Sequence, residues 1–424
     1  MADLSVPAQG VSTRQFSANQ SLVRVSLLAI ILIAPIPAGS NLPIVWCIWA
    51  VALSALTFLW CFSAQSGSIL DVVLTARTPL VLGCCAIGFA VAQSFAGSLA
   101  QSATLLGAIR LLTYAFLFFL LGATVKNTGQ FADVLFFGIA LHATVALLFL
   151  YGINDFSIWG PKQHYLGSAT GTYINRNAFA SLLSMGLILG VSRFARPQFD
   201  KGFWARGCAC GIIIAALLAT QSRAAILLGL GIASICFAVS CGAGQRRTLR
   251  VALFVLPFVV VVAGLTAVSD RSVFAFVDLQ TRAELWHQTL IMIADRPFAG
   301  FGLDTFPMAF ERYHLPTLPV DVVWLHPHNT YLTLWSELGM IAGSLIPLAI
   351  GWVFVILLRA QCLSANHSSI RVAAIGVISF ASLHALVDFS MEIQANVFLF
   401  IAIIALAIVE NRSRSETPVE VENG

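Results

Sequence analysis

Charged residues are scarce in this chain of 424 residues. Asp, Glu, Lys and Arg together make up 10% of the sequence, whereas soluble globular domains carry about 25%. This composition excludes the ordinary folds of soluble enzymes. The formal net charge is only +4 and the basic residues form no long tract, so nucleic acid is not an expected partner.

Disulfide and metal-binding patterns are missing too. Eight of the nine cysteines lie in or beside apolar segments, and Cys362 lies in a short basic loop. Cys208 and Cys210 have CxC spacing instead of CxxC. We expect these cysteines to act as small core hydrophobic residues. No metal ion or other cofactor is predicted from them.

Long apolar runs dominate what is present, since 58% of the residues are hydrophobic. A run of about 20 apolar residues is long enough to span a bilayer as a helix. The runs predict an all-α, polytopic transmembrane bundle with about twelve spans. The expected spans are 22–38, 41–62, 78–96, 103–122, 131–152, 176–194, 206–221, 223–241, 250–268, 329–358, 371–389 and 394–410.

Basic residues set the expected orientation, because most Lys and Arg residues fall in alternate connections between spans. Both termini are then cytoplasmic, and the segments 153–175 and 269–328 face outward. The sequence is predicted to divide into an N-terminal tail 1–21, nine spans in 22–268, a periplasmic loop 269–328 carrying short helices, three spans in 329–410 and a tail 411–424.

The outer loop contains a predicted short helix. Thr281 and Glu284 fit a capping box, and an apolar stripe follows until the segment Asp295–Pro297. Arg282 would then lie in the first turn, where backbone N–H groups and the helix dipole favour a phosphate. An amphipathic surface helix with a solvated Arg282 is the open alternative.

Two further arginines lie at outer ends of spans. Arg223 occupies a tight junction between two apolar runs, and Arg176 stands between Asn175 and Asn177 at the start of another. A charge placed at membrane depth usually marks a functional pathway. Arginines that reach the lipid headgroups are the alternative, which is stronger for Arg176 than for Arg223.

The densest polar cluster is His326-Pro327-His328-Asn329, at the entry of a long apolar helix. A neutral imidazole can accept a proton from a sugar hydroxyl near neutral pH, so a histidine here is a candidate general base. Zinc is the rival use of an HxH pair. No third ligand of the right type is evident nearby.

The helix that follows contains Glu337, which needs a partner inside an apolar span, and a Gly339-xxx-Gly343 step. We expect the two glycines to permit close helix packing. In a later span, His384 and Asp388 are four residues apart and are expected to pair on one helix face. Glu337, His384 and Asp388 are predicted to hold the substrate-contacting residues in position without contacting the substrate themselves.

These residues together resemble the bacterial O-antigen ligase and polysaccharide polymerase superfamily of membrane glycosyltransferases. The resemblance covers about 171–400. It rests on GTYINRN at 171–177, Ser222-Arg223, Arg282 with Trp286, RPFAGFG at 296–302, HPHNTYLTLWSE at 326–337 and HALVDFSMEIQAN at 384–396. The first five expected spans match no motif of the family.

The resemblance implies transfer of a glycan from a polyprenyl (undecaprenyl) diphosphate carrier to an acceptor hydroxyl, at the periplasmic face of the bacterial inner membrane. No nucleotide sugar or metal takes part. By the same resemblance His328 would deprotonate the acceptor hydroxyl, and Arg223 and Arg282 would bind the diphosphate. The substrate-binding candidates also include Arg176, Asn177, His326 and Asn329.

The acceptor is lipid A core if the protein is a ligase and a growing glycan if it is a polymerase. The spacing of Gly339 and Gly343 departs from the GxxG-like spacing of the ligases, and the VDFSMEIQAN ending is more similar to the polymerase and exopolysaccharide branch. A multi-span transporter or lipid-linked glycan flippase is the alternative function. It would require paired halves, and the sequence shows no internal symmetry.

Overall fold

The computed structural model describes residues 9–62, 76–194, 201–241, 272–320, 322–364 and 368–415. All regular structure in these residues is helical, and they contain no β-strand. This confirms the predicted all-α class. The α-helices are α1 (Gln9–Ile33), α2 (Pro43–Cys61), α4 (Arg77–Ala96), α5 (Gln101–Thr124), α6 (Thr128–Leu147), α7 (Arg176–Ser192), α8 (Lys201–Ala219), α9 (Arg223–Ser240), α11 (Ser272–Asp295), α12 (Phe306–Phe310), α13 (Thr330–Leu363), α14 (Ser369–His384) and α15 (Gln394–Ser415).

Most of these helices match the expected spans. In the described part of the chain, 8 helices are long and apolar enough to cross a membrane, and three shorter apolar helices, Asn19–Ile33, Arg176–Ser192 and Ser369–His384, coincide with further expected spans. The expected span 250–268 lies outside the described residues. The chain is therefore a multi-pass helical membrane protein, while the total of about twelve spans stays a prediction.

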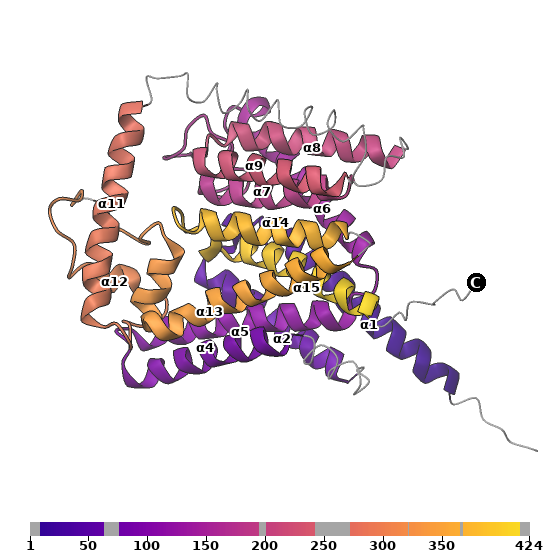
Figure 1. The fold of residues 1–424 in the computed structure, drawn as a ribbon. Coiled ribbons are helices and arrows are strands. Elements are labelled where there is room, and N and C mark those ends of the chain that lie inside the picture. Colours follow the sequence, from indigo (N-terminus) through magenta and orange to yellow (C-terminus); the bar gives the residue numbers. More distant parts are fainter. Residues whose placement is uncertain are drawn as a thin grey trace, which may run out of the picture.

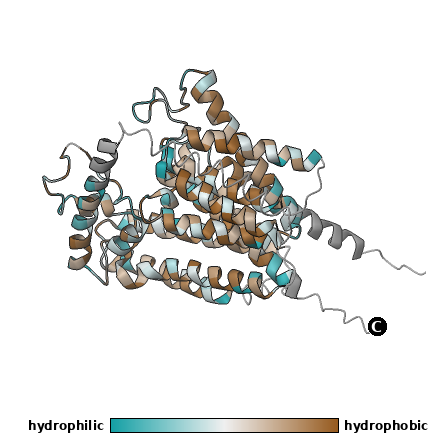
Figure 2. Ribbon diagram, turned by 45° about the horizontal axis from the view of Figure 1, so that its top comes forward, coloured by the Kyte–Doolittle hydropathy of each residue, from teal (hydrophilic) through white to brown (hydrophobic). Residues whose placement is uncertain are grey.

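The bundle is organised around α7. Every residue of α7 from Ala178 to Ser192 is buried, and this helix packs against α9, α14 and α6. The bundle helices run side by side, and α11 crosses one end of the bundle, which we call the loop end (Figure 1). Hydrophobic residues predominate along the bundle helices (Figure 2), as expected for helices that cross a membrane.

Helix α13 is kinked where the sequence predicts one straight helix. Gly339 has a left-handed φ of 77° and breaks the helical geometry. The freed carbonyl oxygens of Ser336 and Glu337 accept hydrogen bonds from the backbone N–H groups of Phe301 and Gly302. The RPFAGFG segment thus supplies backbone N–H donors to carbonyl oxygens that the kink leaves without helical partners.

Gly339 and Gly343 of α13 serve this kink instead of packing two separate helices. A Cβ on Gly343 would lie 2.4 Å from the carbonyl oxygen of Leu334, and a Cβ on Gly339 would lie 2.2 Å from that of Phe298. Side chains are therefore excluded by backbone atoms of α13 itself and of the loop before it. The expected GxxxG contact between helices is replaced by a contact within the bent helix at Gly343 and a contact with the preceding loop at Gly339.

Several predicted boundaries differ from the structure. Helix α1 begins at Gln9, inside the expected N-terminal tail, and α15 extends to Ser415. In the outer loop, α11 has 24 residues, so it is not a short helix, although it ends at Asp295 as predicted. Helix α14 ends at His384, five residues before the expected end.

The loop between α11 and α13 has a core of its own. Leu285 and Met292 of α11 pack in one buried cluster with Phe301, Phe306 and Phe310. This cluster holds α11 and α12 against the loop end of the bundle.

The cysteines all lie within the described residues, and all are free. Only Cys210 and Cys236 are buried. The prediction that the cysteines are core residues is therefore wrong for most of them.

Candidate functional site

Residues 385–393, the α14–α15 loop, connect the elements that carry the predicted site. Arg282 of α11 donates from Nη1 to the carbonyl oxygen of Val387. Nδ2 of Asn177, at the start of α7, donates to Oδ2 of Asp388 over 2.9 Å. The ring of Phe389 contacts both His326 and His328. One short loop thus joins α7, α11 and the start of α13.

His326 is held by a carboxylate. Its Nδ1 lies 2.7 Å from Oε2 of Glu392, and the other oxygen of Glu392 accepts a hydrogen bond from the Thr333 hydroxyl at 2.8 Å. The imidazole also stacks on Phe389 with ring centroids 4.4 Å apart. A carboxylate at Nδ1 fixes both the tautomer and the orientation of an imidazole.

His328 has a left-handed backbone with φ of 53°. Such a conformation costs a non-glycine residue on the order of 1–3 kcal/mol and is found preferentially at functional sites. Its ring meets the edge of Phe389 at 5.0 Å between centroids. The preceding residue is fastened by Trp286, whose indole N–H donates to the Pro327 carbonyl oxygen over 2.9 Å.

Asn329 caps helix α13. Its Oδ1 accepts hydrogen bonds from the backbone N–H groups of Tyr331 and Leu332, at 3.0 and 3.2 Å. The next residue, Thr330, donates its N–H to the carbonyl oxygen of Ala385 in the α14–α15 loop. The structure therefore gives Asn329 a positioning role for the two histidines before it.

Arg282 does not lie in the first turn of a helix. Since α11 begins at or before Ser272, Thr281 is an interior residue and the predicted capping box is wrong. Glu284 accepts hydrogen bonds instead from Gln288 and the Thr317 hydroxyl. These two bonds lower the pKa of Glu284. Any anion binding by Arg282 must then depend on its guanidinium and not on a helix N-terminus.

Arg176 and Asn177 open helix α7. Asn175 caps this helix by accepting the backbone N–H groups of Asn177 and Ala178. The guanidinium of Arg176 lies over the ring of Tyr165 and donates to the Ser168 hydroxyl at 3.4 Å. Cation–π contact with the loop before α7 thus orients Arg176.

Arg223 is an exposed residue at the start of α9, directly after the N-cap residue Ser222. The turn before it is fastened to the same loop that contacts Arg176, because Nε2 of Gln221 donates to the Gly167 carbonyl oxygen over 2.8 Å. The predicted tight junction is confirmed, since α8 ends at Ala219.

A continuous series of contacts links the predicted residues. It runs from the Arg223 turn through loop 165–169 to α7, and then through the Asn177–Asp388 bond to the α14–α15 loop. That loop contacts Arg282 and both histidines. All substrate-binding candidates therefore gather at the loop end of the bundle.

The three residues expected to support the site have separate partners. Glu337 is buried, and its Oε1 accepts the N–H of Phe306. His384 and Asp388 do not pair with each other, because α14 ends at His384 and Asp388 lies in the following loop. His384 bonds Ser181 at 3.1 Å, and Asp388 accepts from Asn177 and Ser390.

Sequence reasoning missed several residues of this region. Glu392 and Phe389 contact His326, and the fully buried Asn396 bonds Tyr173, Ala178 and Ser390. Two acidic residues four apart, just before the last apolar run, could have drawn attention to Glu392. No local signal identifies the role of Asn396.

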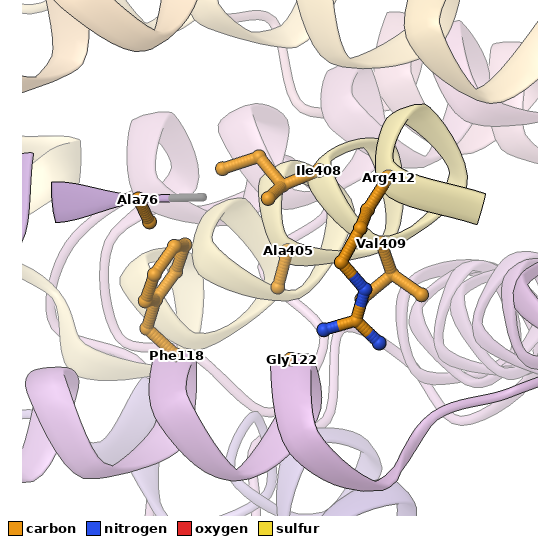
Figure 3. A pocket seen from close by; sticks show the side chains of 7 residues that line it. All are labelled: Ala76, Phe118, Gly122, Ala405, Ile408, Val409 and Arg412. Carbon is orange, nitrogen blue, oxygen red and sulfur yellow. The ribbon is translucent and has the colours of Figure 1, made fainter. Parts of the chain in front are cut away.

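In the described part of the chain, neither a metal cluster nor the small pocket beside Arg412 provides a binding site. The residues that the structure describes contain no group of three or more His, Cys, Asp or Glu side chains that could hold a metal ion. The pocket drawn in Figure 3, lined by residues that include Ala405, Ile408 and Arg412, has a volume of only about 10 Å³. That space fits one water at most.

Comparison with known proteins gives one match. The sequence pattern of the family described as O-antigen ligase matches residues 208–347, which is less than half of the chain. The matched region contains Arg223, Arg282 and the segment from His326 to Glu337, whereas α7 and the α14–α15 loop lie outside it. No curated protein matches the chain.

Proposed function

We propose that the chain transfers a glycan from a polyprenyl diphosphate carrier to an acceptor hydroxyl, and the match of residues 208–347 to the family described as O-antigen ligase supports this. The family supports a membrane glycosyl-transfer role in polysaccharide synthesis. The carrier, the outward orientation of the loop end and the bacterial inner membrane belong to the proposal.

The chemistry requires a base and a stabilised leaving group. The acceptor hydroxyl gives its proton to His328 while its oxygen forms a bond to the anomeric carbon. The bond from that carbon to the diphosphate oxygen breaks, and its electron pair stays on the departing polyprenyl diphosphate. Arg282 and Arg223 stabilise the charge that develops there, for which the planar guanidinium fork is well suited.

One observation carries this proposal: the α14–α15 loop contacts the arginine of α11 and both histidines at once. A group-transfer site needs a cationic group and a base close to the same bond. His326 and Asn329 hold the segment around His328 in place. Asn177 holds the loop that Arg282 contacts. Transfer without a bound metal ion is part of the proposal.

Polymerase activity is favoured over ligase activity by the family likeness of the segment 387–396, whereas the spacing of Gly339 and Gly343 leaves both activities open. Both reactions use the same leaving group, so the site chemistry is shared. The acceptor, a growing glycan or lipid A core, distinguishes them.

The test uses purified protein in liposomes with a polyprenyl diphosphate oligosaccharide, with or without lipid A core. We expect His328→Ala, Arg282→Ala and Arg223→Ala each to lower product at least about a hundredfold while the protein stays folded. The matched controls are His287→Ala and Arg312→Ala, at exposed residues of α11 and of the loop that follows it. Near-normal product from all three site variants would refute the proposal.

A further inference from the structure

A cavity of about 220 Å³ lies between α5, α13, α14 and α15, next to the pair formed by His326 and Glu392. Glu392 lines the cavity and also bonds the imidazole of His326. The polar end of the cavity contains Asp304, Glu337 and Arg110, together with the hydroxyls of threonines. The other end is apolar and continues towards α15, so polar ligand groups are confined to the end near Glu392.

The polar end of the cavity has the carboxyl groups of Asp304, Glu337 and Glu392 beside the guanidinium of Arg110. Nη2 of Arg110 lies 2.6 Å from Oδ1 of Asp304. Oδ2 of Asp304 is buried and has no hydrogen-bond partner among the described residues. Burial raises the pKa of Asp304, although Arg110 acts in the opposite direction. A buried oxygen without a partner is costly. Oδ2 lies against Gly107 of α5, whereas the rest of the Asp304 side chain is partly exposed and lines the cavity.

The backbone of Asp304 has a conformation of the kind that is found preferentially at functional sites. Its φ is 59°, a left-handed value that is uncommon for a residue other than glycine. The position is fixed from both sides, since the Leu303 carbonyl oxygen accepts from Thr104 of α5 and the Phe306 N–H donates to Glu337 of α13. The fold thus holds an acidic side chain at the cavity in a strained conformation.

This lining selects one class of ligand. Carboxylates repel a diphosphate, and none of Arg176, Arg223 and Arg282 lines the cavity. Hydroxyl groups, in contrast, donate hydrogen bonds to carboxylates, and an uncharged sugar offers several of them. The phenol rings of Tyr114 and Tyr331 provide apolar surface for the C–H faces of such a sugar.

We propose that the polar end of this cavity is a saccharide subsite that binds an uncharged sugar residue of the acceptor glycan. Hydroxyls of that sugar donate to Asp304 and Glu392, and Glu392 connects the subsite to His326. The negative lining excludes the carrier diphosphate, so that donor and acceptor are separated by charge. The assignment to the acceptor rests on the proposed function, whereas saccharide binding itself does not.

The test is saturation-transfer NMR on the whole protein in nanodiscs, with methyl glycosides as probes and no carrier present. We expect the methyl glycosides of glucose, galactose and N-acetylglucosamine to bind, and the methyl glycoside of glucuronic acid to bind at least about tenfold more weakly because its carboxylate is repelled. Asp304→Asn and Glu392→Gln should each weaken binding of the neutral glycosides about tenfold.

Glu311→Gln is the matched control, because Glu311 is an exposed carboxylate of the same loop and does not line the cavity. Leu334→Trp fills part of the cavity without removing a polar partner, and it should also reduce binding of the neutral glycosides. This variant tests the inference even if the carboxylate variants fail to fold. The inference would be overturned if no neutral glycoside bound, or if the glucuronide bound as tightly as the neutral glycosides. It would also be overturned if the cavity variants bound the neutral glycosides as tightly as the wild type does. Selective binding without any transfer would instead contradict the proposed function alone.

Discussion

Asn177 and Asp388 meet across 2.9 Å although 211 residues separate them in the chain. The bond joins the start of the buried helix α7 to the α14–α15 loop, which in turn contacts Arg282 and the two histidines. Two motifs outside the matched family region thereby form one site with the motifs inside it.

Replacing Asn177 by Asp should therefore damage the site. Asn177→Asp sets a second carboxylate against Asp388, so we expect the loop to move and the transfer rate to fall about tenfold or more. The thermal unfolding temperature should fall only slightly. Gln280→Glu, which adds the same charge on the exposed surface of α11, is the control. Equal transfer rates for Asn177→Asp and the control would contradict this account.

Asn396 is predicted to matter for stability. Its side chain accepts from the Tyr173 hydroxyl and donates to the carbonyl oxygens of Ala178 and Ser390, all within the core. Asn396→Leu leaves these groups buried without partners, at about 1–3 kcal/mol each. We expect a clearly lower unfolding temperature in detergent. An unchanged unfolding temperature would show that these bonds contribute little.

The sequence predicted the helices well because each apolar run is long and continuous. It also indicated Arg223, His326 and His328 as candidate site residues, since polar residues beside apolar runs are conspicuous. The capping box at Thr281 failed for a local reason: the residues from Ser272 onward continue as helix, so a side chain with capping potential lies inside it.

Partners distant in the chain could not be predicted in the same way. The bonds of His326 to Glu392 and of Glu337 to Phe306 depend on how α13 bends at Gly339 and on where the loop 296–329 returns to it. The expected pair of His384 with Asp388 failed for a related reason, since it assumed that α14 continues for one more turn.

The bend of α13 gives a matched pair of variants. A Cβ on Gly343 would lie 2.4 Å from the Leu334 carbonyl oxygen, whereas a Cβ on Gly351 of the same helix meets no atom within 4 Å. Gly343→Ala should therefore lower the yield of folded protein strongly. Gly351→Ala should fold normally, since it adds a methyl group to open space. Similar folding yields and unfolding temperatures for the two variants would contradict the bent geometry of α13.

The pH dependence of the outer loop follows from Glu284. Hydrogen bonds from Gln288 and Thr317 lower the pKa of Glu284 in the folded protein below the ordinary value of 4.5. Stability gained in this way is present above pH 4.5 and is lost as the pH falls through the lowered pKa. Hydrogen exchange at residues 311–318 should thus accelerate below pH 4.5.

Glu284→Gln is the control for this effect, because an amide keeps the size of the side chain and does not titrate. Its exchange rates, after correction for the intrinsic effect of pH, should change less than those of the wild type below pH 4.5. The same acceleration in both proteins would show that another group is responsible.

The central claim is that polyprenyl diphosphate is the leaving group of a glycosyl transfer at the loop end. The most direct measurement follows free polyprenyl diphosphate and new glycosidic bonds together, by mass, in liposomes that contain the purified protein and a carrier-linked oligosaccharide. We predict equimolar amounts of both, and neither from Arg282→Ala or His328→Ala. Movement of the intact carrier-linked oligosaccharide across the membrane, without release of the diphosphate, would contradict the account.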